Sequence, residues 1–249
     1  MIGGRFVDRP NGGADMAKPK GTSKSRVRKA SGLTPAQAPK ATKGFAMAFG
    51  TPVIAHPWPD SDGLNKELAA LILAKEAESD GMVRSNVGGW HSDLDFFEWG
   101  QPCIDTLKTR VEELTIELMR AISVVKEGKR AFKYRLTGWA NVSRNGDYNG
   151  VHNHPNCLWS GTYYVQPGKP AEGHASNGKL ELLDPRTGVQ MISTEGTVLA
   201  VRYLVDPLPG LMVMFPAWLN HMVHPFYGEG ERISIAFNVF TLEDKSAAV

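Results

Sequence analysis

The second half of the chain is a succession of short segments in which apolar and polar residues alternate. These segments cover residues 132–142, 158–165, 179–183, 197–204, 211–215 and 232–240. Alternation with a period of two is typical of strands that bury one face. Asn-Gly, Pro-Gly and Asn-Gly pairs at 145–146, 167–168 and 177–178 indicate tight turns between the strands. Many short strands joined by turns predict an antiparallel sandwich or barrel.

Two earlier segments repeat apolar side chains at helical spacing instead. They cover residues 64–79 and 102–126, and the second is the longer, opening at Pro102 and followed by Gly128. Both precede the strands, as expected for helices that back one sheet. The chain is therefore predicted to be α+β, mainly β, with two supporting helices.

The first residues differ in composition from the rest. Ten of the 28 Lys and Arg fall in residues 1–44, together with only two of the 26 Asp and Glu. Few large apolar side chains occur there, so we expect a disordered basic N-terminal tail over residues 1–44. Such a tail leaves a nucleic-acid contact open as one hypothesis.

Three histidines are candidate metal ligands. His152 and His154 are two residues apart and, on a strand, would point to the same face. His221 follows an apolar segment that runs into a turn. Three ligands on one face leave open positions on an octahedral ion, and imidazole nitrogens suit Fe(II), Zn or Ni.

A carboxylate anchor follows the last of these histidines. Arg232 and Ser234 share one face of a predicted strand, so a guanidinium and a hydroxyl can meet one carboxylate. The combination predicts a metal that binds an acidic co-substrate and O₂ together. By contrast, we interpret His91 as a surface-loop histidine, His224 and Asp184 as structural, and Cys157 as a small apolar residue.

Cellular location follows from what the sequence lacks. The two cysteines form no disulfide framework, which is typical of a reducing compartment. No signal peptide is recognisable, and the most apolar run, residues 68–74, is too short to span a bilayer. We therefore expect a soluble cytoplasmic protein with no membrane contact.

The chain resembles the 2-oxoglutarate/Fe(II)-dependent oxygenase superfamily, and within it a bacterial and phage branch. The residues that carry the resemblance are Gly-Gly-Trp-His-Ser at 88–92, His-Asn-His-Pro-Asn at 152–156, Trp-Ser-Gly-Thr-Tyr-Tyr-Val at 159–165, Asp-Pro-Arg at 184–186, Phe-Pro-Ala-Trp-Leu-Asn-His at 215–221 and Arg-Ile-Ser-Ile-Ala-Phe-Asn at 232–238. It implies a double-stranded β-helix (a cupin-like jelly roll). The implied organisation is a single oxygenase domain over 45–249, with helical support at 60–128 and the jelly-roll core at 130–241.

The resemblance also implies roles for individual residues. His152 and His221 would bind Fe(II), and Arg232 with Ser234 would bind the far carboxylate of 2-oxoglutarate. Tyr148, Tyr164 and Asn141 would point into the barrel near this co-substrate.

The chain departs from the superfamily pattern at one position. His154 stands where Asp or Glu is usual, so either it completes a three-histidine site or the ion keeps two histidines and a water.

The expected activity is a hydroxylase that oxidises a C–H bond of a small-molecule or peptide substrate with O₂, releasing succinate and CO₂. The alternative is a cupin-like Zn or Ni metalloprotein, an isomerase or a sensor, that does not use 2-oxoglutarate. A homodimer is also consistent with the resemblance.

Overall fold

The computed structural model describes residues 49–122, 133–188 and 202–242. The elements in chain order are β1 (Ile54–Pro57), α1 (Asp62–Glu78), β2 (Asn86–Val87), β3 (Trp90–His91), the 3-10 helix η1 (Phe96–Glu98), α2 (Pro102–Ile122), β4 (Tyr134–Ser143), β5 (Tyr148–His152), β6 (Trp159–Pro170), β7 (Leu180–Leu182), β8 (Tyr203–Val205), β9 (Leu211–Pro216), β10 (His221–Val223) and β11 (Gly228–Thr241). The predicted tail at 1–44, residues 123–126 of the second predicted helix and residues 197–201 of one predicted strand lie outside the described residues.

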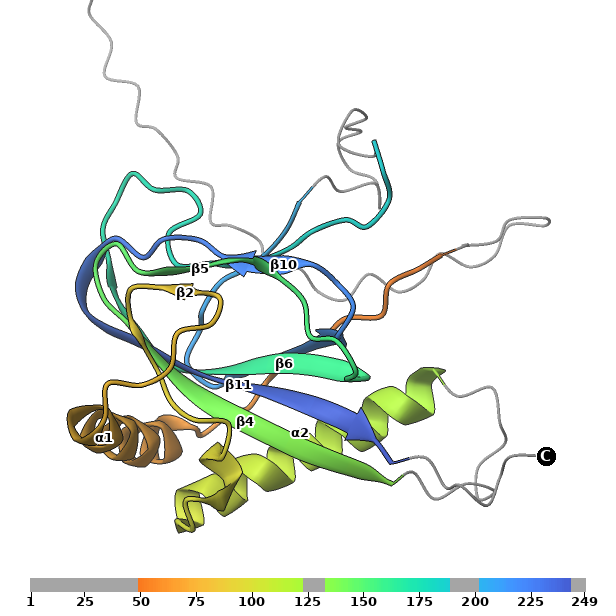
Figure 1. The fold of residues 1–249 in the computed structure, drawn as a ribbon, viewed down its shortest axis with the longest axis horizontal. Coiled ribbons are helices and arrows are strands. Elements are labelled where there is room, and N and C mark those ends of the chain that lie inside the picture. The colour runs from red at the N-terminus through yellow and green to blue at the C-terminus, as the bar shows by residue number, and fades with distance from the viewer. Residues whose placement is uncertain (1–48, 123–132, 189–201, 243–249) are drawn as a thin grey trace, which may run out of the picture. The chain divides into compact units, whose positions relative to one another are not determined.

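The strands form two antiparallel sheets. The larger has the order β1-β9-β6-β11-β4-β3, and the smaller has the order β2-β5-β10-β7-β8. Helices α1 and α2 lie against the larger sheet, on the side away from the smaller one (Figure 1). The predicted mainly-β sandwich with two supporting helices is confirmed.

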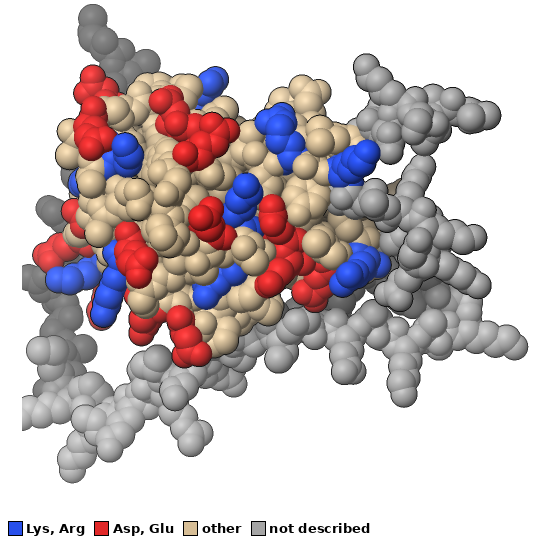
Figure 2. Space-filling view, turned by 90° about the horizontal axis from the view of Figure 1, so that it is seen from below, with Lys and Arg blue, Asp and Glu red and all other residues tan. Residues whose placement is uncertain are grey.

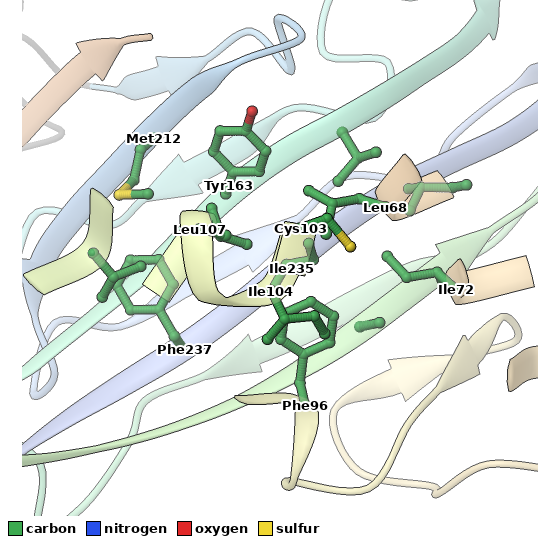
Figure 3. Packing of buried hydrophobic residues seen from close by; sticks show 14 of the residues in the cluster. Leu68, Ile72, Phe96, Cys103, Ile104, Leu107, Tyr163, Met212, Ile235 and Phe237 are labelled. Carbon is green, nitrogen blue, oxygen red and sulfur yellow. The ribbon is translucent and has the colours of Figure 1, made fainter. Parts of the chain in front are cut away.

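The main core lies between the helices and the larger sheet. Its helical side consists of Leu68 and Ile72 of α1 and Ile104, Leu107, Val111, Leu114 and Leu118 of α2. Several of these side chains meet Tyr163, Ile235 and Phe237 of the sheet in Figure 3. Burying each such aliphatic side chain stabilises the fold by about 2 kcal/mol, so the regular stripe on α2 holds that helix on the sheet.

One local expectation was wrong. The Pro167-Gly168 pair lies inside β6 and makes no hairpin turn. Residues Glu229 to Arg232 face only Pro167 to Lys169, so the pair belongs to a β-bulge. Gly168 has φ 68°, and a Cβ there would lie 2.6 Å from the Phe226 ring.

The surface over the helices carries charges of both signs. In Figure 2 Lys and Arg are interspersed with Asp and Glu, and no single sign dominates this face. An ion pair joins Arg144, after β4, to Glu76 of α1 at 2.6 Å. None of the described helices is long and apolar enough to cross a membrane.

Candidate metal centre and co-substrate cavity

The three predicted histidines come together at one end of the smaller sheet. His152 ends β5 and His221 begins β10, and the two are direct partners across these strands. Their ring centroids are 4.2 Å apart, and the His154 ring is 5.1 Å and 5.2 Å from them. One ligand atom of each residue can be chosen so that all three lie within 4.8 Å of one another.

His154 reaches this position by a different route from the one predicted. Strand β5 ends at His152, so alternation along a strand does not place His154. Instead the backbone N–H of His154 donates to the carbonyl of Ala217, in the turn before β10, at 2.9 Å. That bond ties the segment after β5 to the turn that presents His221.

Backbone carbonyls orient two of the three rings. His152 Nδ1 lies 2.7 Å from the Gly150 carbonyl, and His221 Nδ1 lies 2.9 Å from the Leu219 carbonyl. A carbonyl only accepts, so each Nδ1 carries the proton and each Nε2 keeps its lone pair. A ring held in this way is the usual form of a metal-binding histidine.

Burial keeps the three imidazoles uncharged. It lowers the pKa of His152, and it lowers the pKa of His154 to about 4 and that of His221 to about 3. Repulsion from His152 lowers the last two pKa values further. At neutral pH the rings are therefore free bases, the form in which histidine binds a metal.

A buried cation, Arg232, lines the same cavity as the three histidines. Arg232 of β11 is 2% exposed, and its Nε donates to the Gly178 carbonyl at 3.0 Å. Its guanidinium lies 5.5 Å from the centre of the Tyr164 ring and 3.5 Å from Ser234 Oγ. No carboxylate among the described residues pairs with Arg232. Burial accordingly lowers the pKa of this guanidinium.

The phenol of Tyr164 lies beside this guanidinium. Among the described residues its buried hydroxyl has no hydrogen-bond partner, and burial raises its pKa to about 12. Tyr164 is the register partner of Ser234, which in turn pairs with Asn141 on β4. These three side chains therefore lie side by side across the centre of the larger sheet.

One cavity joins these groups. It is lined by His152, His154, His221, Arg232, Ser234, Tyr164 and Asn141, together with apolar residues that include Leu180, Phe215 and Val223. Tyr148 is not among its lining residues, and its neighbour Asn149 is. The reason is a bulge, because residues 149–152 of β5 face only residues 221–223 of β10 and the alternation shifts by one.

Several residues of this cavity were not predicted. Ser85, Trp139 and Asn149 line it. The interpretation of His91 as a surface-loop residue was wrong, because it is 4% exposed, pairs with Asn141 and stacks on Trp139 at 5.4 Å. A strand of two residues such as β3 is too short to show an alternation of apolar and polar residues, so the sequence pattern could not predict it.

The remaining candidates lie outside the cavity. His224 Nε2 is 2.6 Å from the Glu181 carboxylate, and Asp184 pairs with Arg186. Both have the structural roles expected of them.

The fold is shared with solved structures of low sequence identity. A prolyl-4-hydroxylase of Pseudomonas putida is 17% identical with a TM-score of 0.52, covering 78% of this chain and 94% of that one. A prolyl hydroxylase of Trichoplax adhaerens, solved with a peptide fragment of hypoxia inducible factor, is 16% identical with a TM-score of 0.52, covering 76% and 83%. The epimerase SnoN of nogalamycin biosynthesis, described as non-haem and α-ketoglutarate-dependent, is 15% identical with a TM-score of 0.54, covering 76% of each chain.

Sequence comparison identifies the region that holds the cavity. No curated protein matches the chain. Residues 137–238 match the model of a family described as "Putative 2OG-Fe(II) oxygenase", and this range contains all three clustered histidines and Arg232. Over this range the chain is similar to the 2OG-Fe(II) oxygenases, and its fold is the double-stranded β-helix of the solved structures.

Proposed function

We propose that this protein is a 2-oxoglutarate/Fe(II)-dependent oxygenase that acts as a hydroxylase, in which His152, His154 and His221 bind Fe(II). Arg232, Ser234 and Tyr164 would bind the far carboxylate of 2-oxoglutarate, with Asn141 beside them. The substrate is proposed to be a small molecule or a peptide. A peptide is consistent with the prolyl hydroxylases that share this fold, one of which was solved with a peptide fragment.

The observation that carries the proposal is the unpaired charge of Arg232. A buried guanidinium is costly unless an anion compensates it, and the described residues provide none. The partnerless hydroxyl of Tyr164 opens on the same cavity. A carboxylate bound between them would neutralise the first group and accept a hydrogen bond from the second.

The donor atoms fit Fe(II). Three neutral imidazoles can form one face of an octahedral ion and leave positions for a chelating 2-oxo acid and for O₂. None of the described residues that line the cavity is a carboxylate, so these protein ligands would leave the ion's charge unbalanced. The dianionic co-substrate would then supply the negative charge that the third ligand usually provides.

The residues of this chain would position and shield the reaction. When bound, Fe(II) would couple two oxidations by O₂: that of 2-oxoglutarate to succinate and CO₂, and that of a substrate C–H bond. Arg232 fixes the co-substrate by its far end, and the register of β6, β11 and β4 holds the groups around that end in line. Leu180, Phe215 and Val223 keep part of the cavity wall apolar.

Anaerobic titration of the protein with Fe(II) and 2-oxoglutarate tests the proposal. A weak visible charge-transfer band is expected in the wild type and in Arg186→Gln, an exposed control. It should be lost in His221→Ala and should require far more 2-oxoglutarate in Arg232→Gln. If no band appears and His221→Ala binds Fe(II) as the wild type does, the proposed site is wrong.

The Zn or Ni alternative without 2-oxoglutarate gives no role to Arg232. Under that alternative, 2-oxoglutarate should stabilise neither the metal-loaded wild type nor the metal-loaded Arg232→Gln variant. Under the proposal this stabilisation is present in the wild type and lost in the variant.

A further inference from the structure

Ser85, in the segment at residues 81–89, lines the cavity from outside the matched region. Strand β2 pairs with β5, and the Gly150 N–H donates to the Ser85 carbonyl at 2.8 Å. The Asn86 side chain accepts from the Arg84 N–H at 2.7 Å and donates to the Met82 carbonyl at 3.3 Å. The backbone around Ser85 is thus held in place from both sides.

The hydroxyl of Ser85 lies against a proposed metal ligand. Its oxygen is 3.3 Å from Asn149 Nδ2 and 3.4 Å from His152 Nε2. The amide of Asn149 can only donate there, so the Ser85 oxygen accepts from it. His152 Nε2 carries no proton, because Nδ1 donates to Gly150. The hydroxyl hydrogen of Ser85 is therefore directed at Nε2.

Metal binding would remove this acceptor. An ion at His152 takes the lone pair of Nε2, and the Ser85 hydrogen then has to find another partner. Asn149 still donates to the Ser85 oxygen, so the hydroxyl remains oriented as a donor. An acceptor atom of a ligand bound beside His152 would offer this hydrogen a partner.

We propose that Ser85, oriented by Asn149, is a positioning residue that donates a hydrogen bond to the ligand bound next to His152. The ligand class is one that presents an acceptor atom, above all an anionic one, beside the metal. The inference rests on the proposed metal site. It assigns part of the substrate selectivity to residues 81–89, which the family match does not include.

Azide binding to the Co(II)-loaded protein measures this donor without a known substrate. Azide is a small anion that can occupy an open position, and its binding changes the visible Co(II) spectrum. Ser85→Ala should weaken azide binding about 10-fold, the loss expected for one hydrogen bond to a charged acceptor. Co(II) affinity should change less than about twofold. Ser79→Ala, at an exposed position outside the cavity, is the control and should match the wild type.

A cysteine replacement tests the same geometry by a second readout. Ser85→Cys brings a thiol to the place of the hydroxyl, and a thiolate that contacts Co(II) gives an intense near-ultraviolet charge-transfer band. Ser79→Cys should give none.

The outcomes separate this inference from the proposed function. Unchanged azide binding in Ser85→Ala, with no thiolate band in Ser85→Cys, overturns the role of Ser85 while the metal site stands. If the wild type fails to bind Co(II), or if His221→Ala binds it equally well, the proposed site falls and the inference falls with it.

Discussion

Replacing Arg232 by Met separates a co-substrate anchor from a structural ion pair. Breaking a buried ion pair by removing one partner costs about 3–5 kcal/mol, because the other charge is left buried. Arg232 has no such partner among the described residues, so that penalty is absent. Replacing a whole buried ion pair by apolar side chains of similar volume is neutral or stabilises a fold by about 1–4 kcal/mol, and we expect a gain of this order when the unpaired charge of Arg232 is removed.

One hydrogen bond opposes this gain. Met cannot donate to the Gly178 carbonyl, and an unsatisfied buried carbonyl costs about 1–3 kcal/mol. The two effects are similar in size, so the free energy of unfolding of the metal-free, ligand-free variant should stay within about 2 kcal/mol of the wild type.

The effect on 2-oxoglutarate should be much larger. Two charge-assisted hydrogen bonds to a carboxylate contribute about 3–6 kcal/mol, which corresponds to a 10²- to 10⁴-fold loss of affinity. With Zn(II) present to prevent turnover, 2-oxoglutarate at about 100 times its Kd stabilises the wild type by about 2.7 kcal/mol. Arg232→Met should lose this stabilisation.

Urea denaturation with and without 2-oxoglutarate measures both quantities, with Arg186→Met as the exposed control. A fall of 3–5 kcal/mol in the ligand-free variant would mean that Arg232 holds the fold together. Stabilisation by 2-oxoglutarate that survives in Arg232→Met would refute its role as the anchor.

Three further predictions concern the histidines and the bulge. The pKa values of His154 and His221 are lowered in the folded protein, so the unfolded chain binds more protons below pH 6.5. The free energy of unfolding of the metal-free protein should therefore fall as the pH drops from 6.5 toward 4, by up to about 1.4 kcal/mol per pH unit for each imidazole. Urea denaturation measures this, and a His154→Gln/His221→Gln double variant with the same pH dependence would contradict it. Asn238 Nδ2 lies 3.5 Å from His154 Nδ1, and among the described residues its buried Oδ1 has no partner, so a half-turn of the amide would let Oδ1 accept from Nδ1. Asn238→Ala should therefore weaken Co(II) binding about 10-fold, whereas Asn238→Asp and the exposed control Asn153→Ala should not. Equal Co(II) affinities in all three variants would exclude this support of His154. Gly168→Ala should lower the free energy of unfolding by about 1–3 kcal/mol, because φ is 68° and the Cβ would lie 2.6 Å from Phe226. Gly146→Ala, with open space at its Cβ, should lower it less. Thermal denaturation measures both losses, and equal losses would argue against a clash with Phe226.

The architecture was predictable because its main elements carry long, regular patterns. Helix α2 buries the stripe that its spacing indicates, and the long strands β4, β6 and β11 follow the predicted alternation. The failures occur where pairing overrides pattern. Strands β2 and β3 are two residues long and exist because β5 and β4 offer them free edges.

The site was predictable in part for the same reason. His152, His221 and Arg232 belong to compact motifs, and all of them line the cavity. The resemblance placed Tyr148 there, and the bulge in β5 puts Asn149 there instead. Ser85 lines the cavity because β2 pairs with β5, and no pattern in the sequence around residue 85 predicts this pairing. His154 was selected on a strand that ends before it, and a bond to Ala217 puts it in position.

The charge of the cavity connects the unusual ligand with the anchor. Superfamily members usually place a carboxylate where this chain has His154, and that carboxylate offsets part of the metal's charge. Here the described lining residues contain one buried cation and no anion, so a divalent ion would add to an already positive cavity. Under the proposed function, the metal and a dianionic co-substrate would favour each other's binding more strongly than in a site with its own carboxylate, because each would compensate the charge of the other's surroundings. In this proposal His154 and Arg232, far apart in the sequence, belong to one electrostatic arrangement in which 2-oxoglutarate supplies the anion.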